Sequence, residues 1–394
     1  MKKAIIISFY ESSNLGDLEL SSSIDKILKD KDYNLTRYNF TTGIRFENKE
    51  KFNLGNTNGF VFNVLKIIKF LMKFILGRVK YDIMVWKHIT SKIWDKNTIF
   101  NEDFKQTDIV VFAGGNMIMD TSPAWPYLIK KYIDKANYFN KPFYFLYVGV
   151  GPLKYKNSKK VLGKSLRKVK GISVRDEMSK KIINGLVDPC KVILTADPVF
   201  SNPIKFKNKT FKKNEYLNIG ICVLGEMCFV SKNEFLAYIK NLELLVERLS
   251  KSENNSLKII LFSTELLDYK AIEYLQSKII NNKYVTINKV RDLNDLYELY
   301  DGLNFLVGGR MHSMILAQKR LLPFMGIIWQ DKIKGFSILT NSVNKMYTIK
   351  SLKEELNYIV NLIEQQSVDE KILLEMDKTN MELQRIVTIG DIII

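Results

Sequence analysis

Residues 303–317 read Leu303-Asn-Phe-Leu-Val-Gly-Gly-Arg-Met-His-Ser-Met-Ile-Leu-Ala317, and this stretch decides the fold of the chain. Its run Phe305-Leu-Val307 is typical of a short buried strand, and the apolar residues after the two glycines have helical spacing. The pattern predicts a strand, a glycine turn and the start of a helix. Unpaired N–H groups and the positive end of the helix dipole point out of such a turn, so it favours a phosphate or a carboxylate.

Two chemically active side chains stand beside this predicted turn. Arg310 offers a planar fork for a phosphate or carboxylate, and His312 can move a proton near neutral pH. Gly309 lets an anion approach the backbone closely. The simpler alternative, a surface arginine and a capping histidine, stays open on this stretch alone. Because ligands of open α/β sheets bind at the carboxyl ends of strands, we interpret these residues as part of a candidate site.

The first residues of the chain repeat the pattern. Ala4 to Phe9 is an apolar run typical of a buried strand, and the turn Ser12-Ser-Asn-Leu-Gly-Asp17 separates it from a segment with helical spacing. Asn14, Gly16 and Asp17 are therefore candidates to line a ligand site. Asp17 also has a simpler interpretation as the N-cap of the helix, and the sequence leaves both open.

Three further apolar runs end in glycines or in a charged pair. They are Asp108-Ile-Val-Val-Phe-Ala-Gly-Gly-Asn116, Lys141-Pro-Phe-Tyr-Phe-Leu-Tyr-Val-Gly-Val-Gly-Pro152 and Gly171-Ile-Ser-Val-Arg-Asp176. If they are parallel strands, their carboxyl ends lie at one edge of a sheet, where a ligand binds. The candidate residues from these runs are Gly114, Gly115, Asn116, Gly151 and Arg175.

Strand, turn and helix alternate along the chain, which predicts α/β architecture with parallel sheets covered by helices. A lysine-rich stretch without apolar periodicity interrupts this pattern after residue 200. We predict an N-terminal Rossmann-like domain at 1–200, a linker at 201–215, a second Rossmann-like domain at 216–345 and closing helices at 346–394. The closing helices are expected at 351–363 and 367–386, the second of which opens with the capping-box spacing Ser367-Val-Asp-Glu370. Two such domains of similar size predict a cleft between them, the GT-B-like arrangement.

The composition describes a globular protein with an excess of positive charge. Sixty Lys and Arg against 42 Asp and Glu give a formal charge of +18. This excess indicates an acidic partner, which is a nucleic acid, an anionic membrane surface or a phosphorylated substrate. A lysine-rich proteome explains the same excess without any partner, and composition does not decide between them.

The cysteines and the first residues bear on metal binding and location. Cys190, Cys222 and Cys228 form no CxxC pair and no cluster with the two histidines, so we predict no metal site and no disulfide framework. The N-terminal apolar run is too short for a signal peptide and is better interpreted as a strand. We therefore expect a cytoplasmic protein.

One segment has the pattern of a basic amphipathic helix. Residues 60–94 contain Lys66, Lys69 and Lys73 on one helical face, opposite a wide apolar face. Three lysines make a spanning helix unfavourable, whereas a helix lying on the inner face of an anionic membrane suits the pattern. A core helix with one solvent-exposed face is the alternative.

Six short motifs occur in a fixed order along the chain: Asn14-Leu-Gly-Asp17, Ala113-Gly-Gly115, Gly149-Val-Gly-Pro152, Ser173-Val-Arg-Asp176, Ala196-Asp-Pro198 and Gly309-Arg-Met-His312. In this order they resemble the polysaccharide pyruvyl transferase family over residues 3–340. The segment Ile328-Trp-Gln-Asp-Lys-Ile-Lys-Gly-Phe336 is also similar to one that the family carries after its Arg-x-His element.

The resemblance implies transfer of the pyruvyl group of phosphoenolpyruvate onto two hydroxyls of a sugar, which gives a cyclic ketal. It implies a sugar acceptor that is often lipid-linked, no cofactor besides the co-substrate phosphoenolpyruvate, and no nucleic acid. The N-terminal domain would then be the acceptor side and the C-terminal domain the donor side.

The resemblance also suggests roles for the candidate residues. Arg310 and Arg175 would contact the donor, whose phosphate and carboxylate need two sets of cationic or N–H donors. His312 would be the general acid and base. Asp17 would orient or deprotonate the acceptor hydroxyl, and the glycines would supply backbone N–H groups.

Three positions depart from the family pattern. Asn116 stands where a third glycine is common, so the loop there is expected to bind its ligand through a side chain. Leu224 stands near a position that often holds arginine, which removes one basic contact. Leu20 replaces a small residue, which is expected to change the shape of the acceptor site.

Two other classes of function compete with this interpretation. A GT-B nucleotide-sugar glycosyltransferase would use the same helix-terminus anion sites, although the second domain lacks a late acidic pair to hold a donor ribose. A binding protein for nucleic acid or for a surface polymer would use the positive charge. The lysines are dispersed and no nucleic-acid-binding motif accompanies them, which disfavours the nucleic-acid form of this alternative.

Overall fold

The computed structural model describes residues 1–46, 77, 80, 81, 83, 84, 98–206, 217–251, 257–279, 282–366 and 369–390. Most of the predicted amphipathic segment 60–94, including Lys66, Lys69 and Lys73, lies outside the described residues. So do residues 207–215 of the predicted linker. In the described part of the chain, none of the helices combines the length and the apolar character that crossing a membrane requires.

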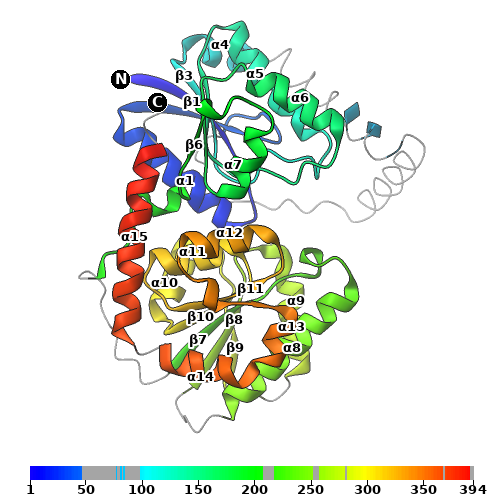
Figure 1. Cartoon of the computed structure of the whole chain (residues 1–394), viewed down its shortest axis with the longest axis vertical. Coiled ribbons are helices and arrows are strands. Elements are labelled where there is room, and N and C mark those ends of the chain that lie inside the picture. The colour runs from blue at the N-terminus through cyan, green and yellow to red at the C-terminus, as the bar shows by residue number, and fades with distance from the viewer. Residues whose placement is uncertain are drawn as a thin grey trace. The chain divides into compact units, whose positions relative to one another are not determined.

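The chain forms two compact units, and Figure 1 shows the helices of each unit packed around its own strands. Unit 1 comprises Met1–Glu11, Ile24–Thr195 and Gly390–Ile394, and unit 2 comprises Ser12–Ser23 and Ala196–Ile389. The first turns of one N-terminal helix, α1 (Leu15–Asp30), therefore belong to unit 2, although the strand before it belongs to unit 1.

Unit 1 contains a parallel six-stranded sheet with the strand order β2-β1-β3-β4-β5-β6. Its strands are β1 (Lys2–Ser8), β2 (Tyr33–Asn39), β3 (Ile109–Ala113), β4 (Phe143–Val148), β5 (Gly171–Val174) and β6 (Val192–Leu194). Its other helices in the described residues include α4 (Thr98–Gln106), α5 (Trp125–Tyr138), α6 (Lys156–Leu166) and α7 (Glu177–Asn184). Every residue of β3 and β4 is buried, as expected for parallel strands covered on both faces.

Aromatic side chains fill the core of unit 1. The ring of Phe40 makes edge-on contacts with Phe112 and Trp125, and Phe112 also contacts Tyr132 of α5. Such edge-to-face pairs stabilise a core beyond the area that they bury. They fasten α5 onto the strands whose carboxyl ends carry the predicted glycines.

Unit 2 contains a second parallel six-stranded sheet, with the order β12-β11-β10-β7-β8-β9. Its strands are β7 (Leu217–Cys222), β8 (Leu257–Phe262), β9 (Val285–Ile287), β10 (Phe305–Gly308), β11 (Phe324–Ile328) and β12 (Met346–Thr348). Its helices include α8 (Lys232–Ser250), α9 (Tyr269–Lys278), α10 (Leu293–Gly302), α11 (Met311–Lys319) and α12 (Asp331–Leu339). In order of sequence this is the 3-2-1-4-5-6 arrangement of a Rossmann fold, with its switch point between β7 and β10.

The two parallel sheets confirm the predicted α/β class. Closing helices follow as predicted, but the expected helix at 351–363 is two helices, α13 (Ile349–Glu354) and α14 (Leu356–Gln366). A capping box between Thr348 and Ser351 starts α13 earlier than the apolar pattern indicates. The last helix is α15 (Glu370–Gly390), and the predicted cap Ser367 lies outside the described residues.

Candidate functional site

The stretch 303–317 forms the strand, turn and helix that its pattern predicts. β10 ends at Gly308, Arg310 is the N-cap residue of α11, and His312 lies in the first turn of that helix. Gly309 has no room for a side chain, because a Cβ atom there would lie within 3.0 Å of the Cys222 carbonyl oxygen and of Leu224. The turn is thus held close to the end of β7, at the switch point of the sheet.

Asp268 holds Arg310 with two hydrogen bonds. The Nε atom of Arg310 donates to Oδ2 at 2.8 Å and its Nη2 donates to Oδ1 at 2.7 Å. The Asp268 carboxylate is buried and also accepts a bond from the Ser263 hydroxyl. Burial disfavours the guanidinium charge, but the hydrogen bond and charge of Asp268 outweigh it and raise the pKa of Arg310 above its usual range. These two bonds use Nε and Nη2, so Nη1 is the nitrogen that they leave for another acceptor.

Trp329 fixes the other side of this arginine. The guanidinium carbon of Arg310 lies 5.9 Å from the centre of the Trp329 ring, within the range of a cation–π contact. The indole Nε1 of Trp329 donates to the carbonyl of Gly309 at 2.9 Å. Both contacts reduce the freedom of the Arg310 side chain, which suits an arginine that must meet an anion in one orientation.

His312 is buried, with 8% of its surface exposed, and two neighbours define its surroundings. A Cβ atom on Gly16 would lie closer than 3.0 Å to Cβ, Cγ and Nδ1 of His312, so the first turn of α1 packs directly on the imidazole. On another side the Oδ2 atom of Asp197 lies 3.9 Å from the imidazole Nε2. Asp197 is itself buried and caps the 3-10 helix η2 (Pro198–Ser201) by accepting the Val199 N–H. A buried carboxylate at this distance stabilises a protonated imidazole.

Backbone and side-chain hydrogen bonds hold the predicted Asn14 loop against the rest of unit 2. The Leu15 N–H donates to the carbonyl of Thr264 at 2.9 Å, and Ser13 donates through its hydroxyl to Glu265. Asn14 accepts the Gly16 N–H through its side chain, which caps α1. The structure therefore gives the N-cap role to Asn14, whereas Asp17 lies inside the first turn and accepts a bond from the Ser12 hydroxyl.

A buried polar network fastens the next turn of α1. The Nζ atom of Lys319 lies 2.5 Å from Glu19 Oε1, and the hydroxyl of Tyr297 donates to Oε2 of the same carboxylate. Burial raises the pKa of Tyr297 above its usual range, and the Glu19 charge adds to the effect. Glu19, Tyr297 and Lys319 come from α1, α10 and α11, so the network ties three elements of unit 2 together.

The remaining predicted residues form a second cluster, in unit 1. Gly114, Gly115 and Gly151 all have positive φ angles, which glycine adopts without strain. A Cβ atom on Gly149 would lie 2.8 Å from Asn116 Oδ1 and 3.4 Å from Arg175 Nε, so this position lies between the two side chains. The loops after β3, β4 and β5 therefore meet here, as their strand order predicts.

Asn116 has a role inside this cluster. Its side-chain Nδ2 donates to the Gly151 carbonyl at 2.8 Å, which ties the loop after β3 to the loop after β4. The Val150 N–H donates to the hydroxyl of Ser179, whose N–H and hydroxyl both donate to Asp176, the N-cap of α7. Arg175, next to this cap, is buried with 6% of its surface exposed.

The predicted residues thus fall into one group in each unit. Unit 2 brings Asn14, Gly16 and Asp17 together with the turn that carries Arg310 and His312. Unit 1 gathers the glycines, Asn116 and Arg175. In the part of the chain that the structure describes, no three His, Cys, Asp or Glu side chains are placed to hold a metal ion.

The partners of these residues were not predicted from the sequence. Asp268 and Glu19 stand in helical patterns without a motif, and Asp197, although part of Ala196-Asp-Pro198, was not among the candidate site residues. Two departures from the family are core residues, since Leu20 and Leu224 are 1% and 0% exposed.

Comparison with known proteins identifies the family. The model of the polysaccharide pyruvyl transferase family matches residues 14–317, more than half of the chain. The chain belongs to the polysaccharide pyruvyl transferase family. The match begins at the Asn14 loop, ends with α11, and so includes Arg175, Arg310 and His312. No curated protein matches the sequence.

Solved structures share the fold of this pyruvyl transferase family member. The UDP-GlcNAc 2-epimerase of Methanocaldococcus jannaschii, in complex with UDP-GlcNAc and UDP, has a TM-score of 0.55 at 13% identity, over 99% of this chain and 100% of that one. HepE of Anabaena, in complex with UDP and glucose, has a TM-score of 0.54 at 8% identity, over 99% and 97%. These similarities show a GT-B-like fold of two Rossmann-like domains. They concern the fold alone and say nothing about which ligand this chain binds.

Proposed function

We propose that this pyruvyl transferase moves the pyruvyl group of phosphoenolpyruvate onto two hydroxyls of one sugar, in the biosynthesis of a cell-surface polysaccharide or secondary cell-wall polymer. The observation that carries the proposal is the Arg310 turn. A doubly held, permanently charged guanidinium stands two residues before a buried histidine, at the switch point of a Rossmann sheet.

Arg310 is proposed as a donor contact. Asp268 and Trp329 fix its guanidinium, and Nη1 is left by the Asp268 bonds to meet a phosphate or carboxylate oxygen. Backbone N–H groups at the start of α11 add to the attraction, since the positive end of the helix dipole lies there. Arg175 is proposed as a second donor contact on the resemblance of Ser173-Val-Arg-Asp176 to the family motif.

The chemistry moves two protons: both come from the sugar hydroxyls, and they are taken up by C3 of phosphoenolpyruvate and by the departing phosphate. The C3 carbon of phosphoenolpyruvate takes a proton, and C2 then carries oxocarbenium-like charge, to which the first sugar hydroxyl adds and loses its proton. The bond from C2 to the phosphate oxygen breaks, and inorganic phosphate leaves. The second hydroxyl adds at C2 and loses its proton, which closes the ketal. The reaction consumes one phosphoenolpyruvate and needs no oxidant, reductant or cofactor.

His312 is proposed to deliver and remove the protons, a role worth about 10²–10⁴ in rate. Asp197, 3.9 Å from its Nε2 atom, supports the protonated imidazole in this role. Asp17 is proposed to orient or deprotonate an acceptor hydroxyl. The glycines of unit 1 and Asn14, Gly16 and Gly309 are proposed to shape the substrate sites and supply N–H groups.

The acceptor is proposed to be a lipid-linked sugar, which would bring the enzyme to an anionic membrane at the inner face of the cell. Acceptor turnover tests the proposed reaction directly. Inorganic phosphate should be released from phosphoenolpyruvate only when a suitable sugar acceptor is present, and mass spectrometry should find the product heavier by one pyruvate less one water. Release of phosphate with no change in the acceptor, across a broad panel of cell-wall sugars, would contradict ketal formation.

A further inference from the structure

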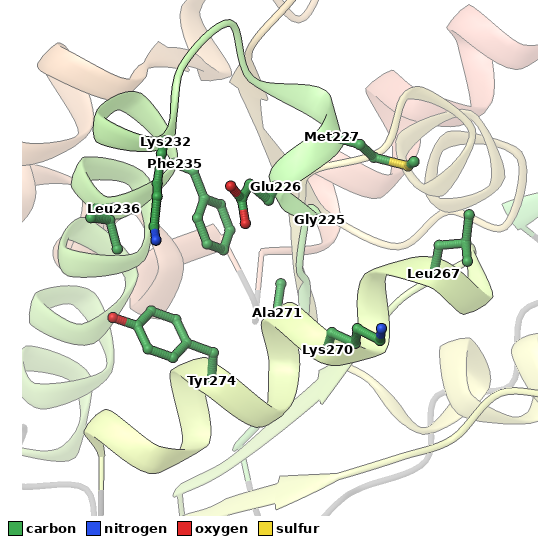
Figure 2. Close-up of a pocket in the computed structure, with 10 residues that line it drawn as sticks. All are labelled: Gly225, Glu226, Met227, Lys232, Phe235, Leu236, Leu267, Lys270, Ala271 and Tyr274. Atoms are coloured by element: carbon green, nitrogen blue, oxygen red, sulfur yellow. The ribbon is translucent and has the colours of Figure 1, made fainter. Parts of the chain in front are cut away.

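Unit 2 contains a cavity of about 480 Å³ that the proposed reaction does not use. Figure 2 shows it between α8 and α9, with the loop after β7 at its head. Its lining residues are Gly225, Glu226, Met227, Lys232, Phe235, Leu236, Leu267, Lys270, Ala271 and Tyr274. The volume lies within the range of pockets that bind small molecules.

The lining combines flat apolar surface with separated charges. Phe235 is buried, and its ring is roughly parallel to that of Tyr274, with the two centres 6.3 Å apart. Lys232 of α8 and Lys270 of α9 are both exposed, and Figure 2 shows their ammonium groups on opposite sides of the cavity, with the Glu226 carboxylate between them in this view. Aromatic faces accept the flat side of a ring, and ammonium groups bind phosphate, so the two features together suit a ligand that has both.

Large apolar side chains are exposed to solvent at the rim of the cavity. Met227 is 68% exposed, Leu267 61% and Leu236 37%. Exposed apolar side chains that gather at one hollow mark a binding surface more often than scattered ones do. The rim therefore supports a ligand site rather than an incidental hollow between two helices.

The cavity is separated from Arg310 by a single layer of residues. Leu267 lines it and precedes Asp268 in the short helix η5 (Leu266–Asp268). A Cβ atom on Gly225, another lining residue, would lie 2.5 Å from Asp268 Oδ1. The cavity thus borders the short helix that carries Asp268, the carboxylate that holds Arg310.

We propose that this cavity binds a small phosphate ester of a ring compound, with the ring on Phe235 and Tyr274 and the phosphate attracted by Lys232 and Lys270, whose two positive charges exceed the single negative charge of Glu226. A sugar phosphate and a nucleoside monophosphate share this chemistry. The proposal concerns a separate site, and it stands whether or not phosphoenolpyruvate is the donor.

Binding of three probes by calorimetry tests the proposal: N-acetylglucosamine 1-phosphate, uridine monophosphate and inorganic phosphate. We expect saturable binding of one of the two esters. The double variant Lys232→Gln/Lys270→Gln should weaken it at least tenfold, and Tyr274→Ala should weaken it as well. The matched control Lys240→Gln, which changes an exposed lysine of α8 outside the cavity, should bind as the wild type does.

The outcomes separate the alternatives. Tighter binding of the sugar phosphate would indicate an acceptor or product site, and tighter binding of the nucleotide a regulatory one. Equal binding of inorganic phosphate would show that no ring is recognised, and it would overturn the proposal. Absence of binding to both esters, or binding that survives all the lysine and tyrosine changes, would also overturn it.

A different observation carries a second inference, on a surface of unit 1. Residues 154–170 contain eight Lys or Arg and no Asp or Glu. All eight are exposed, whereas Leu162, Leu166 and Val169 between them are buried. The α6 basic face consists of Lys154, Lys156, Lys159, Lys160, Lys164, Arg167, Lys168 and Lys170.

Asp134 offsets part of this charge. Asp134 of the neighbouring helix α5 pairs with Lys168 and also with Lys130 of its own helix. Exposed tyrosines lie at the start of α6 and the end of α5, with Tyr155 41% and Tyr138 77% exposed. Tyrosine beside a polybasic surface is typical of proteins that lie on a membrane, where the ring sits among the headgroups.

We infer that the α6 basic face docks on an anionic lipid bilayer. The choice of a bilayer over other polyanions rests on the proposed lipid-linked acceptor. The charged face would hold the enzyme at the surface where such an acceptor is found. Attraction of this kind acts within a Debye length and weakens as salt rises.

Vesicle flotation tests this without phosphoenolpyruvate, so its outcome is independent of the proposed reaction. We expect flotation with phosphatidylcholine vesicles that contain phosphatidylglycerol, and none with phosphatidylcholine alone. Changing Lys156, Lys159, Lys160 and Lys164 to Gln should reduce the bound fraction at least tenfold. The control changes four exposed lysines of unit 2, Lys240, Lys251, Lys278 and Lys334, to Gln and should retain binding.

Binding that both variants retain would overturn the inference and assign docking elsewhere in the chain. Loss of vesicle binding in both variants would show that net charge alone drives binding, and this result would also overturn the inference. Binding of the protein to a DNA fragment, with no flotation on vesicles, would show that the partner of this face is a nucleic acid and not a bilayer.

Discussion

Gly16 shows at the scale of one residue why the Asn14 loop belongs to the site. Its missing side chain is what lets α1 pack on the imidazole of His312. We expect Gly16→Ala to displace the histidine and lower kcat/KM by about 10²-fold, the cost of misplacing a catalytic group by about 1 Å. Overpacking should destabilise the fold by about 1–3 kcal/mol. Steady-state kinetics and urea unfolding measure the two effects.

Gly163→Ala is the matched control for this prediction. A Cβ atom at Gly163, inside α6, would meet its nearest atom at 3.4 Å, an ordinary contact. Alanine there should leave activity unchanged and stabilise the protein by about 0.5–1 kcal/mol. Equal losses of activity in both variants would argue that Gly16 serves only general packing.

Asp268→Asn tests how much the negative charge of Asp268, apart from the size of its side chain, stabilises Arg310. Asparagine keeps the size of the side chain but leaves a mostly buried guanidinium without its counter-charge, which typically costs about 3–5 kcal/mol. Replacing both partners, as in Arg310→Met/Asp268→Leu, should restore much of the stability, because a buried ion pair is often no better than apolar packing. Phosphoenolpyruvate binding should not return in this double variant, because the guanidinium is absent. A double variant that binds as the wild type does would exclude Arg310 as a donor contact.

The three cysteines differ in burial, and this predicts their reactivity. Burial raises the pKa of Cys228 to about 11, and burial also raises the pKa of Cys222, whereas Cys190 is exposed. The thiolate is the reactive form, so at pH 8 iodoacetamide should label Cys190 alone in the native protein and all three after unfolding. Labelling of Cys228 should rise as pH approaches 11. Labelling of Cys228 as fast as Cys190 at pH 8 would contradict its burial.

At this scale the sequence predicted the residues that a motif marks and missed their partners. Arg310, His312 and Gly309 stand out because a glycine turn at a strand end has a chemical meaning by itself. Asp268 does not, since its only sign of importance is contact with an arginine 42 residues away. Such a pairing depends on which strands are neighbours, and a single sequence does not encode that order in any local pattern.

Among the elements, helix α1 positions Gly16 against His312. Its first turns are fastened to α10 and α11 through Glu19, Tyr297 and Lys319, which keeps Gly16 on His312. We expect Glu19→Ala to cost about 3–5 kcal/mol, because it leaves a lysine that is mostly buried without its counter-charge. Tyr297→Phe should cost about 1.5–3 kcal/mol through loss of a bond to a charged group. Chemical denaturation measures both.

An exposed pair on α13 provides the comparison. Lys350 and Glu354 lie 3.7 Å apart with side chains 84% and 58% exposed, so Glu354→Gln should change stability by less than about 1 kcal/mol. A Glu19→Ala loss no larger than that of Glu354→Gln would show that the network does not hold α1.

Elements were predictable where their periodicity is strong. The apolar runs of β3, β4 and β10 predicted strands, and the buried face of α5 follows from its helical spacing. The break between α13 and α14 was missed, because the apolar spacing continues across it. The start of α13 before residue 351 was missed as well, because only the capping box at Thr348 marks it. Caps of this kind involve side-chain hydrogen bonds that hydrophobic pattern alone does not register.

The whole chain combines a fold that its alternating pattern predicts with a division that the pattern does not reveal. Residues 12–23 belong to unit 2 although they follow the first strand of unit 1 directly. Nothing in their composition distinguishes them from an ordinary strand-to-helix turn. The contacts with Thr264, Glu265 and His312 show that this loop is part of the candidate site in unit 2.

Calorimetry of phosphoenolpyruvate binding, wild type against Arg310→Ala, is the sharpest test of the proposed donor site. We expect saturable binding to the wild type that weakens tenfold or more in the variant, because the variant loses a charge-assisted contact worth about 1.4 kcal/mol or more. No binding of phosphoenolpyruvate by the wild type, together with saturable binding of a UDP-sugar, would contradict it and point to a nucleotide-sugar transferase on the same fold.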